Sequence, residues 1–122
     1  MLFRSGLGLM EPRIASSILV SALLRRAEAE GGFGVVLARG DSTSGSVAVL
    51  LTERGANPRL YERLLQPDGR YAWQESGQKN LAEPGELRAM IERRRRFDPD
   101  LWLIELDIAS AERFAAEMNS FG

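Results

Sequence analysis

The sequence predicts an α+β domain: an antiparallel sheet of four to five strands with helices packed on one face, in the order α-β-β-β-β-α-β-α. Three observations predict it. A helical repeat of apolar residues comes first, four short strand-like runs joined by polar turns follow, and a last apolar strand lies between two further helical repeats. We expect residues 12–122 to form this single domain and residues 1–11 to be a flexible N-terminal tail, with either Met1 or Met10 as the start.

The first helix is expected over residues 17–30. Its apolar residues recur at helical spacing on one stripe, namely Leu19, Val20, Leu23, Leu24 and Ala27. Gly31 and Gly32 end the helix, because glycine adopts the left-handed conformation at little cost.

Four strands are expected next, over residues 33–38, 46–53, 59–65 and 70–75. The polar, glycine-bounded segment 39–45 is typical of a hairpin loop, and turns are expected at residues 54–58 and 66–69. Short connections of this kind favour an antiparallel meander.

A second helix is expected to begin near Pro84 and to end before Pro99. Its apolar face carries Leu87, Met90 and Ile91. Residues 101–106 are apolar on both faces, so we place this strand inside the sheet. Ser110 then caps a last helix whose core face carries Ala111, Phe114, Ala115 and Met118.

The amino-acid composition argues against several classes of function. The 122 residues include no His and no Cys, which excludes a Ser-His-Asp triad, a thiolate nucleophile and a soft-ligand zinc or iron–sulfur site. We therefore expect no catalytic residue, no metal site and no cofactor. The net charge of −1 disfavours a dedicated nucleic-acid binder, whose domain is usually strongly basic. The lack of cysteine fits the cytoplasm, and no apolar run approaches the ~18 residues that cross a bilayer.

One candidate interaction surface combines arginines with aromatic rings. Its members are Arg25, Arg26, Tyr71, Trp73, Arg93, Arg95 and Arg96. They are open to three interpretations: solvated helix ends, a contact for an anion or RNA, or anchors of a protein interface. Among the aromatic residues, Trp73 is the first choice as an interface residue, because polar residues surround it in its strand.

A candidate acidic cluster lies around the last strand. Its members are Asp98, Asp100, Glu105 and Asp107. Such carboxylates can hold Mg²⁺ or act as an acid/base pair. The favoured interpretation is that they are surface carboxylates that pair with nearby arginines.

Three segments together resemble a known family. They are residues 20–28 (VSALLRRAE), Arg39-Gly40-Asp41 with Gly45, and residues 95–105 (RRFDPDLWLIE). They are similar to DUF1491, a family of small alphaproteobacterial proteins of unknown function. The resemblance covers about residues 12–107, and residues 108–122 match nothing in it. It implies a bacterial cytoplasmic origin, and it carries no catalytic or binding residue over to this chain.

The sequence favours a non-enzymatic protein-interaction or accessory module. Its partner is an unknown protein or a second copy, since a homodimer would cover the open edges of the sheet. The alternative is a weak binder of RNA or single-stranded DNA that uses the arginines and Trp73. The second alternative is a carboxylate-based enzyme.

Overall fold

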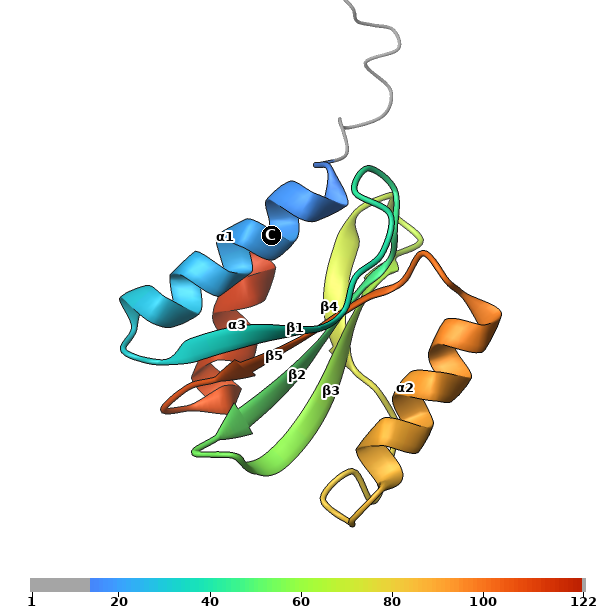
Figure 1. Cartoon of the computed structure of the whole chain (residues 1–122). Coiled ribbons are helices and arrows are strands. Elements are labelled where there is room, and N and C mark those ends of the chain that lie inside the picture. Colours follow the sequence, from blue (N-terminus) through green and yellow to red (C-terminus); the bar gives the residue numbers. More distant parts are fainter. Residues whose placement is uncertain (1–13, 122) are drawn as a thin grey trace, which may run out of the picture.

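The computed structural model describes residues 14–121 (Figure 1). The elements in chain order are α1 (Ser16–Ala29), β1 (Phe33–Ala38), β2 (Val47–Glu53), β3 (Ala56–Leu65), β4 (Tyr71–Glu75), α2 (Glu86–Phe97), β5 (Trp102–Asp107) and α3 (Ala111–Phe121). The α+β class and the predicted order of elements are confirmed. The expected flexible tail of residues 1–11 lies outside the described residues.

The sheet is mixed and not purely antiparallel. Its strand order is β1-β5-β2-β3-β4, with β5 antiparallel to β1 and parallel to β2. The predicted hairpin between residues 33–38 and 46–53 is therefore wrong, because β5 lies between these strands. The prediction that residues 101–106 lie inside the sheet is confirmed. A strand that is apolar on both faces buries most surface when strands flank it on both sides.

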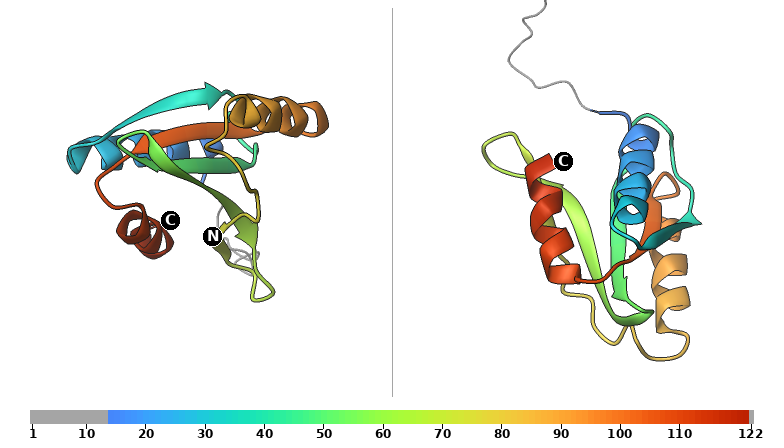
Figure 2. Two further views of the ribbon diagram at one scale, coloured as in Figure 1. Left: turned by 90° about the horizontal axis from the view of Figure 1, so that it is seen from below. Right: turned by 90° about the vertical axis from the view of Figure 1, so that its left-hand side faces the viewer.

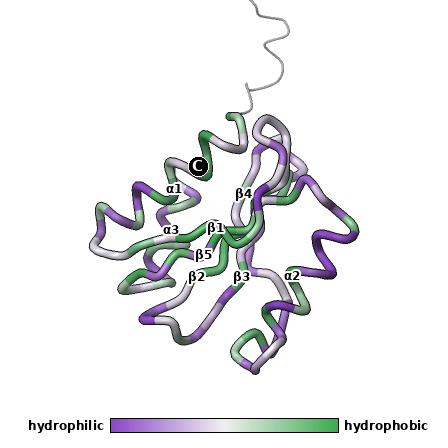
Figure 3. The backbone as a smooth tube through the Cα atoms, in the orientation of Figure 1, coloured by the Kyte–Doolittle hydropathy of each residue, from purple (hydrophilic) through white to green (hydrophobic). Residues whose placement is uncertain are grey.

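Helices cover both faces of the sheet, so the expectation of helices on one face is wrong. One buried cluster joins α1 and α3 to the sheet, and a second joins α2 to the opposite face. Figure 2 shows α2 and α3 on opposite sides of the strands. The cause is in β2 and β5, which are hydrophobic on both faces, so each face needs a cover (Figure 3).

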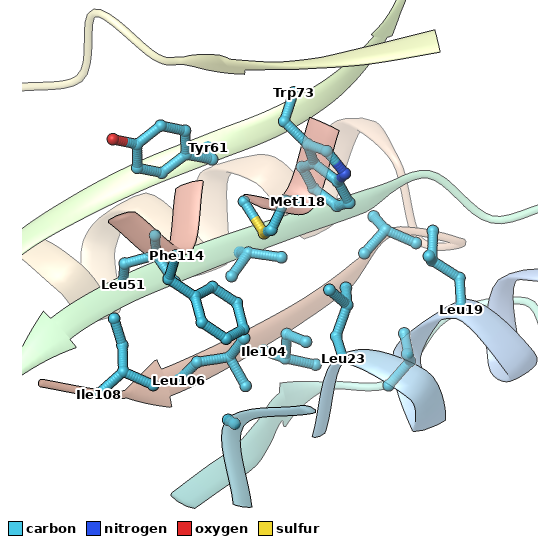
Figure 4. Packing of buried hydrophobic residues seen from close by; sticks show 14 of the residues in the cluster. Leu19, Leu23, Leu51, Tyr61, Trp73, Ile104, Leu106, Ile108, Phe114 and Met118 are labelled. Carbon is cyan, nitrogen blue, oxygen red and sulfur yellow. The ribbon is translucent and has the colours of Figure 1, made fainter. Parts of the chain in front are cut away.

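The larger cluster lies between the sheet, α1 and α3 (Figure 4). Leu23, Ile104, Leu106, Phe114 and Met118 are each at most 1% exposed. The last helix is therefore an integral part of the core.

The turn between β2 and β3 is tighter than predicted. Arg54 and Gly55 have φ angles of 55° and 76°, which is the conformation of a two-residue hairpin turn with positive φ at both positions. The third strand consequently begins at Ala56.

The two edges of the sheet differ. At the β4 edge, the side chain of Asn119 on α3 accepts a hydrogen bond from the backbone N–H of Trp73 at 2.7 Å, and its Nδ2 donates to the Trp73 carbonyl at 3.3 Å. One side chain thus pairs with the backbone of the middle residue of β4 as a neighbouring strand would. Among the described residues, no hydrogen bond besides those of the β1–β5 pairing joins the backbone of β1.

Replacing Asn119 with alanine is expected to lower the free energy of unfolding by about 1–2 kcal/mol, since both backbone groups of Trp73 lose their partner. Chemical denaturation measures the loss, and hydrogen exchange of the Trp73 amide should become faster. Asn119→Asp is the control, because it keeps the acceptor and removes only the donor. Unchanged exchange in Asn119→Ala would contradict this role.

Candidate interaction surface

The arginines of the predicted surface lie on opposite sides of the sheet. Arg25 and Arg26 are on α1, whereas Arg93, Arg95 and Arg96 are in the C-terminal half of α2. Arg26 pairs with Glu30 and Glu117, each at 3.0 Å. The structure therefore divides these arginines into two separate groups, and they do not form one basic face.

Trp73 was expected at an interface, and this is wrong. Its side chain belongs to the core between the sheet, α1 and α3, and the residue is 5% exposed. The reason is the alternation of side chains along the strand, which directs Trp73 to the same face as Tyr61, toward α3. Tyr71 is half-buried, with the guanidinium carbon of Arg63 4.7 Å from its ring centre.

The acidic residues are spread along β5 and the loop before it. The Asp98 carboxylate accepts from the Asp100 backbone N–H at 3.2 Å, Glu105 accepts from the Thr52 hydroxyl at 3.1 Å, and Asp107 accepts from the Arg54 backbone N–H at 2.7 Å. Within residues 14–121, no group of three or more carboxylates is placed to hold a metal ion. The expected pairing with arginine side chains is replaced by these local hydrogen bonds.

One apolar surface feature was not predicted from the sequence. It lies on the open edge strand β1, where Phe33 is 60% exposed and Val35 is 45% exposed. Leu37 on the same face is half-buried against the α2 cluster. We call these three residues the β1 stripe. The available signal was that residues 33–38 contain no charge and no proline, devices that usually protect an edge.

The α2 helix covers only part of this face. Ala38, at the end of β1, is buried in the α2 cluster, while the start of the strand is open. Strand alternation places Glu105 and Asp107 on the same face, opposite Val35 and Phe33 respectively. The start of β1 is therefore bordered by carboxylates.

The end of β1 is bordered by positive charge. Arg95 Nη2 donates to the carbonyl of Arg39, the first residue after the strand, at 3.4 Å. This contact places the C-terminal turn of α2 beside the end of β1. Arg96 is exposed on the same turn, and Arg93 is exposed just before it. Arg94 is paired with Glu62 on β3. The β1 stripe thus runs from an acidic border to a basic one.

Of the helices that the structure describes, none is both long and apolar enough to cross a membrane.

A family model described as "Protein of unknown function (DUF1491)" matches residues 14–116. The match extends past Asp107 into α3, so the part of the chain that seemed to match nothing begins later than expected. No curated protein matches the sequence.

Solved structures of similar sequence share the fold. A crystal structure of a DUF1491 family protein from Caulobacter crescentus is 32% identical, with a TM-score of 0.71 over 80% of this chain and 91% of that one. The solution structure of protein Atu0922 from A. tumefaciens is 31% identical, with a TM-score of 0.66 over 81% and 89% of the two chains.

Proposed function

The chain belongs to the DUF1491 family, and from its own surface we propose that it is a non-enzymatic protein-interaction module of the bacterial cytoplasm. Its partner adds an extended, apolar strand along the open side of β1. The observation that carries this proposal is the exposure of Phe33 and Val35 on an edge strand without charge or proline.

Strand addition fits the contrast between the two edges. A strand that joins an open edge forms main-chain hydrogen bonds, and alternate side chains supply specificity. At β4 the middle residue, Trp73, is already paired with Asn119, so β1 is the more open of the two edges. The half-covered face beside it supplies an apolar surface for the side chains of the added strand.

Lysine in place of Val35 is expected to abolish partner binding, because it puts an unpaired charge at the centre of a contact that becomes buried. The full chain, tagged, is used to retain proteins from an extract of the organism's own cells. A partner retained by the wild type but lost with Val35→Lys is purified and mixed with the wild-type chain. Its binding should then slow hydrogen exchange of the β1 amides.

Leu65→Lys is the matched control. Leu65 is 61% exposed, close to the value for Phe33, but it lies at the end of β3. This variant should retain the same partner as the wild type. Equal retention by Val35→Lys, or β1 amides whose exchange does not change in the complex, would rule out the proposed surface.

A further inference from the structure

We infer that the strand added along β1 is β1 of a second copy of this chain, paired antiparallel about a two-fold axis at Val35. This inference rests on the proposed function, because it names the partner of the same edge.

The β1 stripe is self-complementary in this arrangement. A two-fold axis perpendicular to the sheet keeps every side chain on its own face, so residues that pair must have the same orientation. Pairing centred on Val35 meets this condition and brings Phe33 to Leu37 of the second copy. Leu37 is the extra residue at the irregularity between Val36 and Ala38, and its side chain packs on the α2 side. Six apolar side chains, three from each β1 stripe, then form one continuous cluster on the α2 side.

Charge selects the antiparallel direction. Asp107 lies opposite Phe33 at the start of β1, and Arg95 contacts the residue that follows the end of β1. Antiparallel pairing sets the start of one strand beside the end of the other. The Asp107 carboxylate then lies near Arg95 of the second copy, and the axis repeats this contact. A parallel arrangement would need a two-fold axis along the strands, which puts the two β1 stripes on opposite faces of the joined sheet, so neither the apolar cluster nor this charge contact would form.

The same geometry explains why the open edge carries neither charge nor proline, with an irregularity between Val36 and Ala38 as its one interruption among the described pairs. Edge strands are normally guarded by charge, proline or a cover to prevent uncontrolled pairing. A two-fold contact is closed, because both copies use the same β1 edge, which is then no longer available, and the Trp73 backbone at the far edge is paired with Asn119. Pairing therefore ends at two chains and forms a ten-stranded sheet.

Sedimentation of the purified full chain across micromolar concentrations tests the inference. The expected mass is twice the 13.5 kDa of one chain. Val35→Lys should raise the dissociation constant about a hundredfold or more, while Leu65→Lys should leave it unchanged. Arg95→Glu and Asp107→Lys should each raise it about tenfold, and the double variant, which swaps the charges, should recover most of the loss.

Three outcomes would overturn the inference. The first is a wild-type chain that stays monomeric, and the second is a dimer that Val35→Lys does not weaken. The third is a double variant whose dissociation constant is as high as that of the single variants, which would rule out the antiparallel arrangement. Circular dichroism of each variant separates misfolding from lost association. If the chain is a monomer, the cell-extract experiment still tests the proposed function. A different protein is then retained at β1.

Discussion

Replacing Phe114 with alanine is expected to lower the free energy of unfolding by about 3–5 kcal/mol, the range for large-to-small changes of buried aromatic residues. Phe114 is 1% exposed and lies with Leu106, Ile108 and Met118 in the cluster under α3 (Figure 4). The loss combines the transfer of the ring to water with the cavity that it leaves. Urea denaturation, read by tryptophan fluorescence, measures it.

Leu65→Ala is the control, since Leu65 is 61% exposed and is not part of the buried cluster that contains Phe114. It should change the stability by no more than about 0.5 kcal/mol. If Phe114→Ala is equally harmless, α3 does not close the core in solution. Because association stabilises the folded chain, both variants are compared with the wild type at the same protein concentration.

The stability of Phe114→Ala would show whether the last helix closes the core in solution. The sequence predicted this role only in part. Periodicity correctly predicted its core face, from Ala111 to Met118, because burial of a helix stripe is a local property. The family resemblance, by contrast, ended at Asp107, before the residues that close the core. The role of Asn119 had no signal at all, because a polar residue near a chain end forms its contact with a strand 46 residues away.

The order of the strands in the sheet could not be predicted from the sequence, for a related reason. Each strand could be found from its own residues, but the insertion of β5 between β1 and β2 depends on pairing between distant segments. The short polar connection between β1 and β2 favoured a hairpin on local grounds, and the burial of β5 overrode it. The error mattered for function, because only the correct order shows that β5, with Glu105 and Asp107, lies beside the edge strand β1.

Trp73 illustrates the opposite failure. Polar neighbours in sequence suggested an exposed ring, yet the core lies on the face to which alternation directs it. Its Nε1 is buried without a hydrogen-bond partner among the described residues. Burial of the large apolar ring outweighs the cost of this single donor.

The second large loss of stability is expected for a substitution in the segment between β1 and β2. This segment forms no hairpin and instead packs around the backbone before β5. The Asp41 backbone N–H donates to the Asp100 carbonyl at 3.0 Å, and the Trp102 indole donates to the Asp41 carbonyl at 2.7 Å. The Asp41 carboxylate accepts from the Ser44 and Thr43 backbones, which lowers the pKa of Asp41 below its ordinary value. These contacts hold the loop in one conformation.

Gly45→Ala is expected to cost about 1–3 kcal/mol, because a methyl group at this position would lie 2.1 Å from the Asp100 carbonyl oxygen. The methyl carbon is bonded directly to the Gly45 backbone and the oxygen belongs to the Asp100 backbone, and hydrogen bonds hold both segments. A side-chain rotation therefore cannot relieve the overlap. The shift should also loosen the start of α1, since the Ser16 hydroxyl donates to the Gly45 carbonyl. Denaturant unfolding measures the cost, and faster exchange of the Ser16 amide reports the loosening.

Gly77→Ala separates this steric cost from the general effect of replacing glycine. Nothing lies within 4 Å of a methyl group at Gly77, so the substitution should be neutral or slightly stabilising, because alanine restricts the unfolded chain. Equal stability of Gly45→Ala and Gly77→Ala would mean that the loop moves freely away from Asp100. The predicted difference therefore tests whether this loop, one of the three segments that carry the family resemblance, is a fixed support that joins α1 to the centre of the sheet.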